Sequence, residues 1–168
     1  NYESSILPSV WAKEDKYLDL IIPSNKYCKE IFISAGWDKK KIKVVPLGID
    51  YNFFNNAERL KCFDDKFNFL NISIPHFRKN IDVLIESYYR AFQNNKDTRL
   101  ILKTSLNKPS HSFECFVPKI IHDIQKKLKF KEFPSLTLVN ERYDNLGCLY
   151  KASDCLISTT GSEGFGLP

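Results

Sequence analysis

Two short segments carry residue types that could bind a charged ligand. The first is the adjacent pair Arg78 and Lys79, which follows an apolar run ending at Pro75 and precedes a helix start near Asn80. The first turn of a helix presents backbone N–H groups without intrahelical partners and about half a positive charge. Two further cations at that place predict a phosphate or diphosphate site. A solvated basic pair on a surface loop is the alternative.

The second segment is the glycine-rich run 161–168, which contains the carboxylate of Glu163. Gly164 and Gly166 permit positive φ and a close approach of the backbone to a ligand. A preceding strand would present Glu163 to hydroxyl groups or to a cation, whereas a flexible loop with an exposed acid is the alternative. The run is neither a nucleophile elbow nor a P-loop, because the spacing of its glycines fits neither motif.

Apolar runs bounded by proline and glycine predict strands that alternate with helices. We expect strands at 18–22, 42–45, 67–74, 100–102, 136–139 and 155–158. We expect helices at 24–35, from 80 or 82 to 94, 118–130 and 144–151, with N-caps at Ser24, at Asn80 or Asp82, and at Asp144, and a C-cap at Gly36. The polar stretch 51–66 is predicted to be a linker.

This alternation predicts an α/β fold with a parallel sheet and helices on both faces. Ligands of such sheets bind at the carboxyl ends of the strands, so both charged segments would lie at one edge.

Composition limits the classes of protein to consider. The chain has 168 residues, of which 43% are hydrophobic and 27% charged, so a globular core is expected. The net charge of +5 is mild, and the aromatic residues are not interleaved with basic ones, so no nucleic-acid partner is expected. The absence of methionine suggests a fragment of a longer protein. Scattered cysteines without a CxxC pair, no apolar run long enough for a membrane span and no signal peptide predict a cytoplasmic protein.

Four segments taken together resemble glycosyltransferase family 4. In chain order they are Pro46–Asp50, Arg78–Asn80, Tyr150–Asp154 and Ser162–Pro168. The resemblance implies a GT-B fold of two Rossmann-like domains, a nucleotide-sugar donor and transfer with retention at the anomeric carbon. Residues 1–50 would be the end of an N-terminal acceptor-binding domain, and residues 51–168 a C-terminal donor-binding domain that is truncated at its end.

The resemblance also implies roles for particular residues. Lys79 would bind the donor diphosphate and Glu163 the hydroxyls of the donor sugar. Arg78 would supply a guanidinium, because Ile74 stands where the family has an arginine. Asn80 replaces the glycine that follows the lysine in the family's pattern. These three, Lys79, Arg78 and Glu163, are the expected catalytic residues. The expected donor-binding residues are Asn140, Glu141, Arg142 and Tyr143 at the base, and Gly164, Phe165, Gly166 and Leu167 at the sugar and phosphate.

The expected partners follow from the same resemblance. The nucleotide-sugar is a substrate, and neither a cofactor nor a metal is expected, in keeping with the absence of a D-x-D motif. The acceptor would be a glycan, as in polysaccharide biosynthesis, or a lipid-linked molecule. Five lysines on or just beyond the helix at 118–130 could dock on anionic lipid at a membrane surface, with a solvated helix face as the alternative. A non-catalytic nucleotide-binding scaffold and another GT-B enzyme, such as an epimerase or a phosphorylase, remain alternatives.

Overall fold

The computed structural model describes residues 5–104, 116–140 and 146–162. The chain divides into two compact units: among the described residues, the larger comprises Asp50–Gly161, and the smaller comprises those up to Ile49 together with Ser162. The larger unit contains one parallel sheet of four strands, in the order β3-β2-β1-β4. Its strands are β1 (Phe67–Ile72), β2 (Thr98–Lys103), β3 (Ser135–Val139) and β4 (Cys155–Leu156). The predicted α/β fold with a parallel sheet is thus confirmed.

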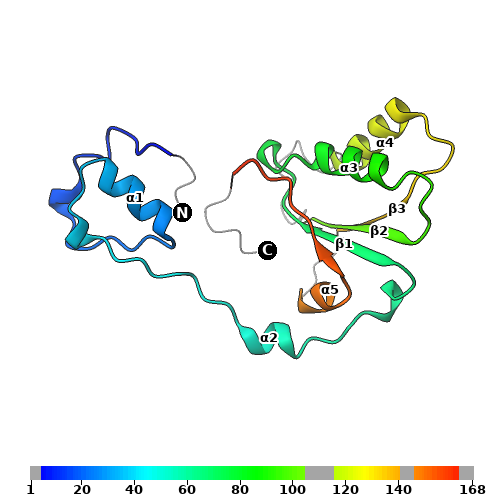
Figure 1. Cartoon of the computed structure of the whole chain (residues 1–168), viewed down its shortest axis with the longest axis horizontal. Coiled ribbons are helices and arrows are strands. Elements are labelled where there is room, and N and C mark those ends of the chain that lie inside the picture. Colours follow the sequence, from blue (N-terminus) through cyan, green and yellow to red (C-terminus); the bar gives the residue numbers. More distant parts are fainter. Residues whose placement is uncertain (1–4, 105–115, 141–145, 163–168) are drawn as a thin grey trace. The chain divides into compact units, whose positions relative to one another are not determined.

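Helices cover both faces of this sheet. α3 (Ile81–Ala91) and α4 (Phe116–Leu128) lie on one face, and α5 (Gly147–Lys151) lies on the other (Figure 1). Successive side chains of a strand point to opposite faces, so Leu100 and Leu102 pack with α3 and α4 while Ile101 packs with α5. Burial on both faces explains why the strands read as continuous apolar runs in the sequence.

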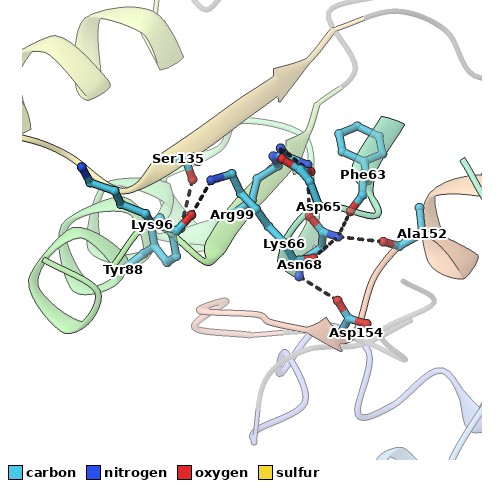
Figure 2. A network of polar contacts seen from close by, with 10 residues as sticks. All are labelled: Phe63, Asp65, Lys66, Asn68, Tyr88, Lys96, Arg99, Ser135, Ala152 and Asp154. Carbon is cyan, nitrogen blue, oxygen red and sulfur yellow. Dashed lines mark hydrogen bonds and ion pairs between the residues drawn. The ribbon is translucent and has the colours of Figure 1, made fainter. Parts of the chain in front are cut away.

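A network of polar contacts joins the amino ends of the strands (Figure 2). Asn68 is fully buried, and its side-chain amide donates to the carbonyls of Phe63 at 2.6 Å and Ala152 at 3.2 Å. The backbone N–H of Asn68 donates to the Asp154 carboxylate at 2.8 Å. Asp154, which lies in one of the segments that carry the family resemblance, therefore fixes the start of β4 beside β1.

The prediction of a linker at 51–66 is wrong. This stretch forms the short helix α2 (Tyr51–Asn55) and a 3-10 turn that carries the buried Phe63. The ring of Phe54 meets that of Tyr150 edge-on, with centroids 5.5 Å apart. These contacts could not be predicted from the sequence, because the partners of both phenylalanines come from distant parts of the chain.

The smaller unit is built around α1 (Lys26–Ser34). The side-chain oxygen of Asn25 accepts the backbone N–H of Cys28 at 2.7 Å, so Asn25 rather than Ser24 caps the helix. The capping oxygen must reach an N–H two or three residues later, and Ser24 lies one residue too early for that. Gly36 follows the helix with a φ of 94°, as its predicted C-cap role requires.

Several further boundaries differ from the sequence prediction. The expected strands 18–22 and 42–45 reduce to one parallel bridge between Ile21 and Ile42. β1 and β4 are each two residues shorter than expected. α5 begins at Gly147, and the predicted cap Asp144 lies outside the described residues.

Candidate functional site

The loops that follow β1 and β4 are hydrogen-bonded to each other at the carboxyl edge of the sheet. The carbonyl of Arg78 accepts the backbone N–H of Gly161 at 2.8 Å and the hydroxyl of Thr160 at 3.3 Å. Thr159 shares its hydroxyl between the carbonyls of the two residues after Arg78, at 3.0 Å from each. We call these contacts of Arg78–Asn80 with Thr159–Gly161 the loop clamp. The clamp joins the basic pair to the segment that leads directly into the glycine-rich run.

Asn80 completes the clamp through an unusual backbone conformation. Its φ of 49° and ψ of 47° lie in the left-handed region, which glycine enters freely and asparagine tolerates better than most residues. Its side-chain amide donates to the carbonyl of Thr159 at 2.9 Å. The structure therefore gives a physical reason why an asparagine can stand at a position where the family resemblance puts glycine.

The basic pair lies in a 3-10 turn, Phe77–Lys79, directly before α3. His76 precedes this turn, and its Nδ1 accepts the backbone N–H of Arg78 at 3.4 Å. Both Arg78 and Lys79 are half-buried. The structure thus places both cations beside the N-terminus of an eleven-residue helix, where the helix dipole adds to their positive potential.

Asn140 is the one predicted base-binding residue that the structure describes. It is exposed directly after β3, and its side-chain oxygen accepts the hydroxyl of Thr104 at 2.9 Å. The residue therefore lies at the same carboxyl edge as the loop clamp. The remaining predicted site residues lie outside the described part of the chain: Glu141, Arg142, Tyr143, Glu163, Gly164, Phe165, Gly166 and Leu167.

Lys103 is a charged residue at this edge that the sequence analysis missed. Only 6% of its surface is exposed, and its cross-strand neighbours are the apolar Ile72 and Val139. Its ammonium donates to the carbonyl of Thr104 at 2.5 Å, and burial lowers the pKa of this ammonium. In a sequence, a lysine at the end of an apolar strand looks like the first residue of the following loop. Its burial therefore could not be predicted from the local pattern.

The described residues also bear on metal binding and on contact with a membrane. Among the described residues, no group of histidine, cysteine or acidic side chains could hold a metal ion. Within the same residues, no helix is long and apolar enough to cross a membrane. On α4, the ammonium of Lys127 donates to the Glu86 carboxylate at 2.8 Å, so one of the five lysines considered for lipid contact is paired within the protein.

No family model matches the chain, and no curated protein does either. Several solved structures match the chain. HepE from Anabaena, in complex with UDP and glucose, matches with a TM-score of 0.62 and 16% identity over 92% of this chain and 42% of HepE. A glycosyltransferase from Rickettsia africae matches with a TM-score of 0.64 and 17% identity over 94% of this chain and 43% of that one.

The pneumococcal O-GlcNAc transferase GtfA, in complex with UDP and GlcNAc, also matches, with a TM-score of 0.62 and 18% identity over 94% of this chain and 29% of GtfA. The fold is that of the GT-B glycosyltransferases. At these identities the similarity establishes the fold alone, and the chain spans less than half of each of these proteins.

Proposed function

We propose that this chain is the donor-binding part of a retaining glycosyltransferase of the family 4 type. The observation that carries the proposal is the loop clamp, which joins Arg78 and Lys79 to the segment that leads into the glycine-rich run. HepE and GtfA, which share the fold, were solved with UDP or a UDP-sugar. Residues 1–50 are then the end of the acceptor-binding domain, and residues 51–168 form the donor-binding domain.

In this proposal the leaving group of the reaction is a nucleoside diphosphate. Lys79 and Arg78 bind its phosphate oxygens, and the N-terminus of α3 adds to their positive potential. Charge develops on the diphosphate as the bond to the sugar breaks, so fixed cations stabilise the transition state more than the ground state. The clamp contributes by holding the cations in place before the donor arrives.

The remaining residues of the proposed site have complementary tasks. Asn140 and the three residues after it contact the base, while the backbone of residues 164–167 lines the sugar and the phosphates. Glu163 accepts hydrogen bonds from hydroxyls of the donor sugar. The two cations supply the positive charge that the diphosphate needs, so the proposal includes no metal ion. The acceptor is a glycan or a lipid-linked molecule, and the protein acts in the cytoplasm, where a lipid-linked acceptor would bring it to a membrane surface.

Thermal unfolding of the chain with UDP, GDP, ADP and dTDP tests the donor site. A ligand at 100 times its dissociation constant stabilises the folded state by about 2.7 kcal/mol, which is easily measured. We expect one nucleotide to raise the melting temperature. The Lys79→Ala substitution should weaken its binding by about ten- to a hundredfold, because a charge-assisted hydrogen bond to phosphate is lost.

The matched control is Lys126→Ala, which removes the same charge from an exposed position in the last turn of α4. The last turn of α4 leads toward the start of β3, so it lies toward the amino ends of the strands, away from the proposed site. Nucleotide binding should be unchanged in this variant. No stabilisation by any nucleotide, or the same loss in both variants, would contradict the proposal.

A further inference from the structure

A hollow adjoins the turn that carries the basic pair. It has a volume of about 270 Å³ and is lined by His76, Phe77, Asn80, Ile81, Asp82 and Ile120. The hollow is therefore formed by the loop after β1, the first turn of α3 and the early part of α4. It is slightly smaller than the roughly 300–1,000 Å³ of pockets for drug-sized ligands, so it suits one small cyclic unit.

The described part of the chain leaves the large apolar side chain of Phe77 in water. It is 83% exposed, although a phenylalanine gains free energy when its ring leaves water. Its ring lies against that of His76, with centroids 4.3 Å apart and planes inclined by 39°. Together the two rings form an aromatic surface at the rim of the hollow.

The polar lining of the hollow favours a neutral ligand that has many hydroxyl groups. Asp82 adds an exposed carboxylate in the first turn of α3, which accepts hydrogen bonds from hydroxyls and repels a phosphate. Ile81 and Ile120 add apolar surface. A pyranose ring has an apolar face of C–H groups that packs on an aromatic ring, whose face is electron-rich, and a rim of hydroxyls that donate to carboxylates.

We propose that this hollow binds a monosaccharide unit of the acceptor, with its C–H face on Phe77 and its hydroxyls on Asp82. The inference rests on the proposed function, because the hollow shares its turn with the cations assigned to the donor. Phe77 directly precedes Arg78, and Asn80 belongs to both the hollow and the loop clamp. A sugar bound there would lie beside the donor diphosphate without competing for the same cations.

Saturation-transfer difference NMR with the methyl glycosides of glucose, galactose, mannose and N-acetylglucosamine tests this subsite in the present chain. At least one glycoside should receive saturation, and it should do so equally with and without saturating nucleotide. Phe77→Ala should weaken this binding by about five- to tenfold, whereas Phe77→Tyr keeps a ring and should retain it. Phe67→Ala is the control, since Phe67 is a partly exposed phenylalanine at the opposite, amino end of β1.

The two proposals fail in different ways. Lys79→Ala should weaken nucleotide binding while the glycoside signal persists, and Phe77→Ala should weaken glycoside binding while stabilisation by nucleotide persists. Absence of saturation transfer to every glycoside, or an equal signal in wild type and Phe77→Ala, overturns the sugar subsite even if nucleotide still binds. Displacement of the glycoside by nucleotide also overturns it, because the two ligands would then share one site.

Discussion

The two edges of the parallel sheet use polar residues in opposite ways. At the amino edge, polar side chains bond to one another and to backbone around the fully buried Asn68, and the Arg99 guanidinium pairs with the Asp65 carboxylate at 2.8 Å (Figure 2). At the carboxyl edge, two loops are held through backbone carbonyls and threonine hydroxyls. There Phe77 and Asp82 stay exposed around a hollow.

This difference separates the polar residues that stabilise the fold from those that are available to bind a ligand. The side-chain amide of Asn68 donates to buried carbonyls. These hydrogen bonds stabilise the fold, and the same N–H groups are therefore not available to a ligand. At the carboxyl edge, the clamp uses the carbonyls of Arg78–Asn80, while the side chains of Phe77 and Asp82 are exposed. Substitutions in the amino-edge network should therefore change stability. At the carboxyl edge, removal of a proposed ligand-binding side chain such as Lys79 should change binding, whereas Asn80 and Lys103 act on the stability of the edge itself.

The largest expected effect on stability is at Asn68. Asn68→Ala leaves the buried carbonyls of Phe63 and Ala152 without their donor, so the free energy of unfolding should fall by about 3 kcal/mol. Urea unfolding measures it. Asn52→Ala, an exposed asparagine in α2, should change stability by less than about 0.5 kcal/mol. Equal effects of the two substitutions would show that the amino-edge network does not stabilise the fold.

Asn80 tests whether the left-handed backbone or the side-chain amide matters more to the loop clamp. Asn80→Gly and Asn80→Ala both remove the bond to the Thr159 carbonyl, but alanine must also adopt a φ of 49°. The strain of a non-glycine residue there is about 1–2 kcal/mol, so we expect the alanine variant to be less stable than the glycine variant by about 1 kcal/mol. Chemical denaturation of the pair measures this difference. Equal stabilities would mean that the backbone relaxes out of the left-handed region.

The smallest expected effect is at Lys103, where the change should be stabilising. Lys103 is buried and burial lowers the pKa of its ammonium, so Lys103→Met should raise the free energy of unfolding at pH 7 by on the order of 1 kcal/mol. Lys126→Met is the exposed control and should have no measurable effect. A loss of stability in Lys103→Met would show that the ammonium is needed at this edge.

The pH dependence of the wild type gives a second measure of the same group. The pKa of Lys103 is lowered in the folded state, whereas the unfolded chain keeps its proton up to about pH 10.5. The unfolded state therefore binds more protons between the two pKa values, and the contribution of Lys103 to stability rises with pH across that window. Burial raises the pKa of Tyr88, Tyr89 and Tyr150, which opposes this rise only near pH 10 and above. The rise should be absent in Lys103→Met.

Much of the fold could be predicted because the information is local. The apolar runs at β1, β2 and β3 and the helical spacing of Ile81, Leu84, Ile85 and Tyr88 identify the elements of the larger unit. The prediction for the stretch 51–66 is wrong because the packing partners of its apolar residues are distant in the sequence. Phe63, for example, is buried against Leu70 and Leu149, from another strand and another helix.

The candidate site was predicted in outline and not in its contacts. The sequence places Arg78 and Lys79 after a strand, and strand order then determines that the loop from β4 lies beside them. The hydrogen bonds of Thr159 and Thr160 could not be predicted, because neither threonine belongs to a motif. The left-handed conformation of Asn80 could be predicted only from the family resemblance, which places a glycine at this position.

Calorimetric titration of wild type, Lys79→Ala and Asn68→Ala with the stabilising nucleotide, beside urea unfolding of all three, tests the division between the two edges most directly. We predict that Lys79→Ala loses affinity by about ten- to a hundredfold at unchanged stability. Asn68→Ala should lose stability and keep its affinity at a temperature where it is folded. If Lys79→Ala binds nucleotide like the wild type, or if both substitutions lower affinity alike, the carboxyl edge is not the donor site.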